Sequence, residues 1–174
     1  MRFLTTPLQG AFLIELEPHT DERGLFARTF CAREFREHGL VDAFLQCNTS
    51  FNCAKGTLRG LHYQAPPSEE AKLVRCTAGA ISDVIVDLRP DSATYLQHFA
   101  IELSARNRTA LYIPAPFAHG FQTLEDDTEV FYQMGDYYAP ELSTGIRWND
   151  PKLGIKWPLP VSTISDKDRT WPLL

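Results

Sequence analysis

Residues 59–64 read RGLHYQ, a strand-like run that contains a titratable imidazole, His62. Three other chemically capable side chains lie on separate segments: Lys72 in AKLVRC, Tyr132 in EVFYQM and Asp168 in ISDKD. An imidazole, an ammonium group, a phenol and a carboxylate are the groups needed to move a proton beside a carbonyl. The sequence therefore predicts a proton-transfer site if the fold brings these four segments together.

Strand geometry places a condition on this site. In a regular strand alternate side chains point to opposite faces, so Arg59 and His62 would point apart. They converge only if the chain bulges at Gly60 or if the strand begins after it. Glycine is compatible with a bulge, because it tolerates the backbone angles that a bulge requires.

The segments around this run are short and typical of β-strands. Each is rich in β-branched or aromatic residues and is closed by turn residues: 11–18, 96–104, 109–114, 119–125 and 128–134. Residues 72–88 contain two more such runs on either side of TAGA, which predicts a hairpin that turns at Gly79. This spacing indicates an all-β fold, either a sandwich, a jelly roll or a barrel.

Two segments depart from the strand pattern. CAREFREHG, residues 31–39, predicts one short helix that ends at a glycine. Past Tyr138 the chain contains WNDPKLGIKWPLP, whose prolines limit ladder pairing, so we expect a C-terminal tail that wraps the body. The length suits one domain over residues 1–174.

Residues 44–52 alternate with a period of two, which is typical of a strand with two different faces. The face that we expect to pack carries Leu45, Cys47, Thr49 and Phe51. The opposite face carries Gln46, Asn48, Ser50 and Asn52. This polar face is either solvated or lines a wet cavity, and the pattern leaves both open.

Composition excludes several classes of protein. Hydrophobic residues make up 44% and charged residues 22%, which is ordinary for a folded globular chain. The net charge of -5 argues against general affinity for nucleic acid or for an anionic membrane surface. No apolar run reaches the ~18 residues of a membrane span, and the N-terminus does not read as a signal peptide. The four cysteines lack CxxC spacing, so we expect free thiols and a cytoplasmic protein.

Metal binding is one alternative use of the histidines. His62 and His119 lie on different predicted strands, as the ligands of metal-binding cupins do. Those proteins usually carry a second histidine two residues after the first, and here that position is Gln64. A third ligand near His119 is also missing from the sequence, so we expect no metal.

For proton transfer, His62 is the predicted base, because an ordinary histidine already titrates near neutral pH. Asp168 is predicted to hold the other ring nitrogen and to favour the imidazolium form. The plainer alternatives are a histidine satisfied by a backbone carbonyl and a surface carboxylate within SDKDR.

Lys72 is predicted to stabilise the negative charge that develops on the carbonyl oxygen. Tyr132, protonated at neutral pH, is predicted to return a proton from the opposite face. Each residue has a structural alternative. Lys72 could be an edge-strand lysine that deters aggregation, and Tyr132 could be a packing residue with one hydrogen bond.

With these residues in place, the chain resembles the dTDP-4-dehydrorhamnose 3,5-epimerase family, which comprises nucleotide-sugar epimerases of the cupin superfamily. The resemblance runs nearly from end to end and is specific in its combination of RGLHYQ, AHGF and WNDP. It rests on DERGLF (21–26), GTLRGLHYQAPP (56–67), KLVRC, DVIVDLR, IPAPFAHGF (113–121), TEVFYQM, GIRWNDP (145–151), IKWP and SDKD.

The resemblance implies a cupin-type jelly roll barrel with one or two short helices, usually a homodimer, that needs no metal or other cofactor. The expected substrate is a nucleoside-diphosphate 4-keto-6-deoxy sugar, inverted at C3, at C5 or at both. The family's pattern assigns His62 as the base with Asp168 behind it, Tyr132 as the acid and Lys72 as the group near the keto oxygen.

The family's other active-site positions also have counterparts in this chain. Gln46 and Asn48 match pocket-lining positions, which favours the wet-cavity interpretation of residues 44–52. Four more residues match substrate contacts: Arg59 and His119 within the active site, and Arg23 and Phe26 at nucleotide and diphosphate contacts that come from the neighbouring subunit.

One position departs from the family's pattern. Arg28 stands where members commonly carry a glutamate, which replaces an acceptor-only anion with a donor-only cation. If Arg28 contacts the base, the preferred nucleotide could differ from thymidine; otherwise the change is a compensated surface substitution. The motifs also leave open a mono-epimerase acting at C3 or C5 alone, a 3,4-ketoisomerase-like relative and a non-catalytic cupin that binds sugar nucleotides.

Overall fold

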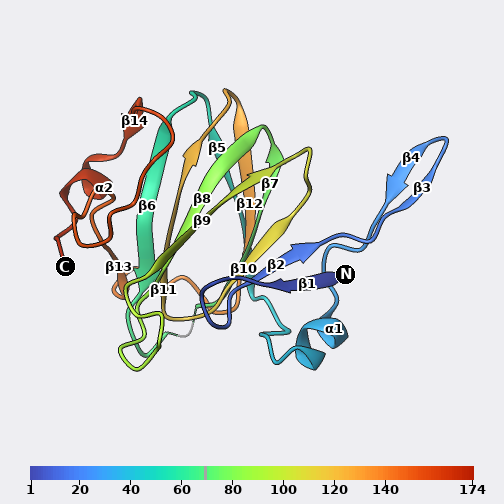
Figure 1. The fold of residues 1–174 in the computed structure, drawn as a ribbon, viewed down its shortest axis with the longest axis horizontal. Helices are drawn as coiled ribbons and strands as arrows, with labels where there is room; N and C mark the ends of the chain where they lie inside the picture. Colours follow the sequence, from blue (N-terminus) through green and yellow to red (C-terminus); the bar gives the residue numbers. More distant parts are fainter. Residues whose placement is uncertain (69) are drawn as a thin grey trace.

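The computed structural model describes residues 1–68 and 70–174. These residues form two six-stranded sheets that face each other, a separate two-stranded hairpin and two short helices (Figure 1). The all-β prediction is therefore confirmed. Within the described ranges, no helix combines the length and apolar character needed to cross a membrane.

The first sheet has the strand order β1-β2-β10-β7-β12-β5. Its strands are β1 (Arg2–Thr5), β2 (Phe12–Glu15), β10 (Ala110–Ile113), β7 (Lys72–Ala78), β12 (Thr128–Met134) and β5 (Gln46–Asn52). The second sheet has the order β13-β6-β11-β8-β9, with β14 paired to β6. Its strands are β13 (Ser143–Gly145), β6 (Thr57–Gln64), β11 (Phe117–Thr123), β8 (Ala80–Asp87), β9 (His98–Ser104) and β14 (Thr163–Ile164).

Three apolar clusters hold these layers together. The largest lies between the sheets, where Val74 and Val130 of the first sheet meet Ile85 and Phe121 of the second. A second cluster packs helix α1 (Ala32–Glu37) onto the first sheet through the fully buried Phe35. A third packs the tail residues Ile146 and Leu153 against side chains of the second sheet: Leu61, Val84, Val86 and Ala118.

Residues 72–88 do not form the predicted hairpin. Strand β7 belongs to the first sheet and β8 to the second, and only Gly79 separates them. Gly79 has φ +71°, and a Cβ at this position would lie 2.4 Å from the Thr128 hydroxyl oxygen. The chain therefore bends from one sheet into the other at a glycine, as strands do at the corners of packed sheets.

Strand β5 presents the opposite face to the interior from the one we expected. Leu45 is 47% exposed and Phe51 is 53% exposed, whereas the polar side chains of the strand point inward and Asn52 is buried. The expectation that the apolar face packs was wrong within this chain. A period of two separates the faces of a strand, but it does not say which face is inside when the interior contains a polar cavity.

The prediction of a wrapping tail is confirmed. The tail supplies β13, β14 and helix α2 (Asp166–Thr170), which lie against β6 (Figure 1). The Arg147 Nε donates to the Trp171 carbonyl at 2.8 Å, and a Cβ on Gly145 would lie 2.6 Å from the Trp171 ring. The tail is thus fixed to the sheet next to RGLHYQ.

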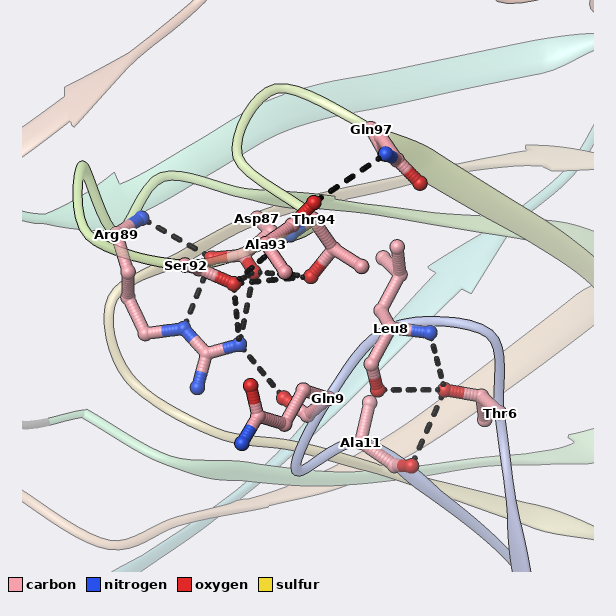
Figure 2. A network of polar contacts seen from close by, with 10 residues as sticks. All are labelled: Thr6, Leu8, Gln9, Ala11, Asp87, Arg89, Ser92, Ala93, Thr94 and Gln97. Carbon is pink, nitrogen blue, oxygen red and sulfur yellow. Dashed lines mark hydrogen bonds and ion pairs between the residues drawn. The ribbon is translucent and has the colours of Figure 1, made fainter.

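A buried polar network lies at the C-terminal end of β8 (Figure 2). Asp87 is fully buried and accepts hydrogen bonds from Arg89, Ser92 and Thr94 at 2.6 to 2.9 Å. The Arg89 guanidinium also donates to the Gln9 carbonyl at 2.6 Å. Burial acts to raise the pKa of Asp87, but these hydrogen bonds outweigh it and hold the pKa far below its usual range. The network ties the loop after β8 to the N-terminal turn.

Candidate active site

A cavity of about 570 Å³ lies between the two sheets and the tail. His62 lines it from β6, Lys72 from β7, Tyr132 from β12 and Asp168 from α2. The structure therefore brings together the four segments that carry the predicted proton-transfer groups. The remaining lining residues include Thr49, Ser50, Phe51, Arg59, Tyr63, Gln64, Glu70, His119, Phe121, Met134, Tyr138, Ser143, Ser165 and Lys167.

A bulge at Gly60 allows Arg59 and His62 to line the same cavity. The pairing of β6 with β11 shifts register between His119 and Phe121, opposite this glycine. Gly60 has φ +121°, and a Cβ there would lie 2.6 Å from the Cα of Gly120. Only glycine fits this position without displacing the neighbouring strand. The condition set by strand geometry is met in this way.

His62 and Asp168 form a close pair. The His62 Nε2 lies 2.5 Å from the Asp168 Oδ1, which leaves Nδ1 of the ring for a substrate. The other carboxylate oxygen accepts the backbone N–H of Gly60 at 3.1 Å, and the Trp171 indole donates to Oδ1 at 3.3 Å. Burial acts to raise the pKa of Asp168, but the hydrogen bond and charge of His62 and these donors lower it below the usual value.

The local sequence explains how the tail delivers this carboxylate. Ser165 is the N-cap of α2, and its hydroxyl accepts the backbone N–H of Asp168 at 3.1 Å. The spacing of Ser165 and Asp168 in SDKD is that of a helix N-terminus, so this signal was present in the sequence. It predicts a helical turn that fixes Asp168, and only the fold shows that the turn faces His62.

Tyr132 projects from the opposite sheet. It packs against the central apolar cluster and lies opposite Asn48 and Val74 in the pairing of β12 with its neighbours. The residues that the structure describes offer its hydroxyl no hydrogen-bond partner, so the group is available to a ligand. Burial raises the pKa of Tyr132, and the negative charge of Glu70 raises it further, while Arg59 acts in the opposite direction. The phenol is therefore protonated over a wide pH range.

Two more predicted residues have defined partners at the cavity. The Arg59 Nε donates to the Asn52 Oδ1 at 2.7 Å, which orients the guanidinium. The His119 Nε2 lies 2.8 Å from the Asp83 Oδ1, and His119 is paired directly with His62 across the β6–β11 ladder. Arg59 thus adds hydrogen-bond donors beside the proton-transfer groups, and His119 adds the ring nitrogen that Asp83 does not bind.

Gln64 has a structural use at the position where a metal-binding cupin would carry a histidine. Its amide donates to the Ser68 hydroxyl at 2.8 Å and to the Tyr137 carbonyl at 3.2 Å, and its oxygen accepts the Ala139 N–H at 2.6 Å. Across residues 1–68 and 70–174, no group of three His, Cys, Asp or Glu side chains has a geometry that could hold a metal ion. Gln64 instead ties two loops beside the cavity.

Comparison with known proteins identifies the family. The family model described as dTDP-4-dehydrorhamnose 3,5-epimerase matches residues 5–174. The chain belongs to this epimerase family. The family resemblance seen in the sequence is thereby confirmed, and so is the prediction of an epimerase.

Individual members of the epimerase family agree over their whole length. A dTDP-4-dehydrorhamnose 3,5-epimerase from Methanothermobacter thermautotrophicus is 47% identical, over 98% of this chain and 92% of the relative. The crystal structure of the Bacillus anthracis enzyme with TDP and PPi bound has a TM-score of 0.96 at 41% identity, covering 99% of both chains. The Legionella pneumophila dTDP-6-deoxy-D-glucose-3,5-epimerase in complex with dTDP-4-keto-L-rhamnose has a TM-score of 0.92 at 39% identity, covering 99% of this chain and 92% of that one. These matches confirm the cupin-type jelly roll.

Three residues near the N-terminus that were linked to substrate binding from the sequence lie away from the cavity of their own chain. Arg23 and Phe26 belong to the hairpin of β3 (His19–Asp21) and β4 (Gly24–Phe26), which projects from the body (Figure 1). Arg23 pairs with Asp21, and the Phe26 ring is exposed. The Arg28 guanidinium lies 3.2 Å from the Glu34 carboxylate, outside the cavity.

Gln46 and Asn48 are not among the residues that line the cavity, although they pair with Met134 and Tyr132, which do. The Gln46 Oε1 accepts the Tyr138 N–H at 2.6 Å, and the Asn48 amide contacts the Met134 sulfur at 3.1 Å. Both partners line the cavity. In this chain the two polar residues therefore support the wall, while Ser50 of the same strand face lines it.

The structure also adds residues that the sequence did not single out. Glu70, Tyr138 and Lys167 line the cavity, and Asp83 sits behind His119. Glu70 and Asp83 gave no signal, because their sequence contexts, SEEAK and ISDVIVD, read as a solvated charge run and as an ordinary strand. Their positions follow only from the pairing of strands that are distant in sequence.

Proposed function

We propose that this chain inverts one or both of the carbons that flank the C4 ketone of a dTDP-linked 4-keto-6-deoxy sugar. The observation that carries the proposal is that His62 and Tyr132 line one cavity from opposite sheets. Groups on opposite walls can address the two faces of a sugar ring held between them. The relatives solved with TDP and with dTDP-4-keto-L-rhamnose support a dTDP-linked substrate.

In this proposal His62 removes the proton from the carbon beside the ketone. Its Nε2 is held by Asp168, so the proton moves from carbon to Nδ1 and the ring becomes an imidazolium. The lowered pKa of Asp168 keeps that carboxylate negative beside the new charge. The carboxylate thereby stabilises the imidazolium and fixes the ring's orientation without taking the proton itself.

Loss of the proton leaves an enolate, whose negative charge lies on the C4 oxygen. Lys72 lines the same cavity and supplies an ammonium group for that oxygen. Arg59, oriented by Asn52, supplies a second positive charge. Both charges are fixed before the reaction, so little reorganisation is needed when the enolate forms.

Tyr132 completes the inversion by donating its phenolic proton to the carbon from the opposite face. Its raised pKa keeps it protonated until this step. The balance of each turnover is one proton gained by His62 and one lost by Tyr132. Exchange with solvent restores both groups, and the same cycle at the second flanking carbon gives double inversion.

The decisive experiment incubates the protein with dTDP-, CDP- and GDP-linked 4-keto-6-deoxy sugars in heavy water and follows the sugar carbons by NMR. We expect deuterium at C3 and C5 of the dTDP-linked substrate. Deuterium at one carbon alone would identify a mono-epimerase. Saturable binding without any deuterium uptake would instead indicate a non-catalytic sugar-nucleotide-binding module and would contradict the proposal.

We also propose that the working form is a homodimer in which each β3–β4 hairpin reaches the partner's cavity. The hairpin projects from the body and leaves Phe26 75% exposed (Figure 1). Strand β5 is an edge strand, with the exposed Leu45 directly before it and the exposed Phe51 within it, and exposed apolar surface of this kind is typical of an interface.

Complementation tests this arrangement. Arg23→Ala and His62→Ala copies should each be inactive alone. If Arg23 acts across the interface, a mixed dimer contains one intact cavity, so refolding the two variants together should restore about a quarter of wild-type activity. If Arg23 acts within its own chain, the mixture stays inactive. Light scattering of the wild type gives the mass of the assembly independently.

We infer that the protein works in a reducing compartment, and we propose the cytoplasm. Its four cysteines are free, and Cys47 and Cys53 are exposed. An oxidising compartment would expose such thiols to disulfide formation. Thiol labelling in intact cells would test this: rapid labelling by a membrane-impermeant reagent would contradict a cytoplasmic location.

A further inference from the structure

Glu70 is a buried carboxylate at the cavity that has no role in the mechanism above. Its side chain is 6% exposed, and its Oε1 lies 3.2 Å from the Lys72 Nζ, whose own side chain is 9% exposed. Charged side chains this far from water are rare in proteins unless they are paired with an opposite charge. The pair therefore forms part of the site rather than of the solvated surface.

The strand register places this ion pair beside Tyr132. Lys72 lies opposite Met134 in the β7–β12 ladder, and Tyr132 lies opposite Val74. Lys72 and Tyr132 are therefore diagonal neighbours on the inward face of one sheet, within reach of long side chains. Glu70, two residues before Lys72, lines the same cavity as both.

We propose that Glu70 is a positioning residue of the proton-transfer site, which fixes the ammonium group of Lys72 and places a negative charge beside the phenol of Tyr132. This inference rests on the proposed function, and it gives Glu70 a role in the proposed reaction. The first effect is geometric. A lysine carries its charge on a flexible stem with three donors, so one ion pair restricts the ammonium group and leaves two donors for a substrate oxygen.

The second effect is electrostatic. Burial makes the largest contribution to the raised pKa of Tyr132, and Glu70 makes the largest contribution among the charged groups that raise it. Arg59 lowers this pKa and Tyr138 raises it. Six other charged or titratable side chains line the cavity and stay unchanged in the test: His62, Tyr63, Lys72, His119, Lys167 and Asp168. Removing the charge of Glu70 should therefore make the phenol more acidic.

Two variants separate these effects. Glu70→Gln keeps the size of the side chain but removes its charge, whereas Glu70→Asp keeps the charge but shortens its reach. Glu37→Gln, on the exposed face of α1, is the matched control for loss of one negative charge. Each variant is first compared with the wild type by thermal unfolding, so that kinetics are read only from folded protein.

We expect Glu70→Gln to lower kcat about tenfold with little change in KM, because the ammonium group loses its anchor. The alkaline limb of its pH profile should move to lower pH; the limb is assigned to Tyr132 if Tyr132→Phe removes it. Glu70→Asp should also lower kcat but keep the alkaline limb near its wild-type position. Glu37→Gln should match the wild type. A wild-type kcat together with an unmoved alkaline limb in Glu70→Gln would overturn the inference.

A titration without substrate separates this inference from the proposed function. Protein labelled with carbon-13 at the tyrosine Cζ is titrated by NMR, and the Tyr132 signal is the one missing from Tyr132→Phe. In Glu70→Gln this signal should titrate at lower pH than in the wild type. If the wild type epimerises no 4-keto sugar, the proposed function fails whatever the titration gives. If it does epimerise and the Tyr132 titration is unmoved, the electrostatic role of Glu70 fails alone.

Discussion

Two neighbouring histidines of one sheet each pair with an aspartate, and the two pairs have different surroundings. His62 and His119 are directly paired across β6 and β11, and each binds an aspartate through Nε2. The His62 side chain is 42% exposed to the cavity, whereas that of His119 is only 11% exposed. The same combination of histidine and aspartate therefore has two uses. His62 is open to a substrate and can act as a base, whereas His119 is largely enclosed and can act as a hydrogen-bonding group.

The aspartates differ in the same direction. Asp168 arrives on a helix from the tail and has three donors for its two oxygens: the His62 ring, the Gly60 N–H and the Trp171 indole. Asp83 comes from the adjacent strand β8, and its Oδ2 is buried with no hydrogen-bond partner among residues 1–68 and 70–174. A carboxylate whose two oxygens both accept hydrogen bonds can stabilise the imidazolium that forms on its histidine during the reaction. A carboxylate with one oxygen unbonded is better suited to orienting a ring.

Replacing the two histidines should give the largest difference. His62→Ala should lower kcat by about a thousandfold and abolish uptake of solvent deuterium, because the base is lost. His119→Ala should raise KM and lower kcat by less than a hundredfold, with deuterium uptake retained. Steady-state kinetics and NMR in heavy water measure both. Deuterium uptake by His62→Ala at the wild-type rate would show that another group is the base.

Replacing Asp168 should give the next largest effect. Asp168→Asn keeps the shape of the side chain but removes the charge that stabilises the imidazolium, so kcat should fall about a hundredfold. Asp166→Asn, two residues earlier and exposed in the same helix α2, is the control and should retain wild-type kcat. Equal kcat values for the two variants would contradict the role of Asp168.

Asp83→Asn should act more on stability than on rate. The substitution weakens the bond to His119 within a fully buried site, so the free energy of unfolding should fall by about 1–3 kcal/mol. The value of kcat should fall at most about tenfold, since His119 stays near its position. Urea unfolding and kinetics of one preparation give both quantities. A larger loss of rate than in Asp168→Asn would reverse the assignment of the two pairs.

The sequence identified the exposed pair but not the enclosed one, and the reason is physical. His62 and Asp168 could be matched because proton transfer requires particular groups. Strand parity required either a bulge at Gly60 or a later strand start, and the structure has the bulge. Asp83 had no such requirement, because a carboxylate inside ISDVIVD looks like any strand residue until β8 pairs with β11.

The two errors of fold have a related cause. Turn residues at 77–80 predicted a hairpin, but a single glycine moved the chain to the opposite sheet. Alternation in residues 44–52 separated two faces correctly, but a polar cavity reversed which one is inside. Local patterns determine element type and face, whereas the partner of a strand and the content of the interior depend on residues far away in sequence.

Asp87 is a third buried aspartate and serves as a reference for the other two. It is fully buried, both of its oxygens accept hydrogen bonds, and it lies outside the cavity. Asp87 is bound by Arg89, Ser92 and Thr94, and its pKa is lowered by these bonds against the opposing effect of burial (Figure 2). A carboxyl whose pKa is lower in the folded state stabilises the fold above its unfolded pKa of about 3.9, and this contribution is lost as pH falls below that value. Asp87→Asn should therefore reduce the free energy of unfolding near neutral pH by about 2 kcal/mol.

The difference between Asp87→Asn and the wild type should shrink as pH falls below about 5, because the carboxyl of the unfolded chain takes up a proton near pH 4 whereas the folded protein keeps it charged to much lower pH. At neutral pH kcat should stay at the wild-type value, since no residue of this network lines the cavity. Asp91→Asn, exposed in the same loop, is the matched control and should follow the wild type throughout. Urea unfolding at several pH values measures the effect, and a stability difference that is constant with pH would mean that Asp87 acts through packing rather than through its charge.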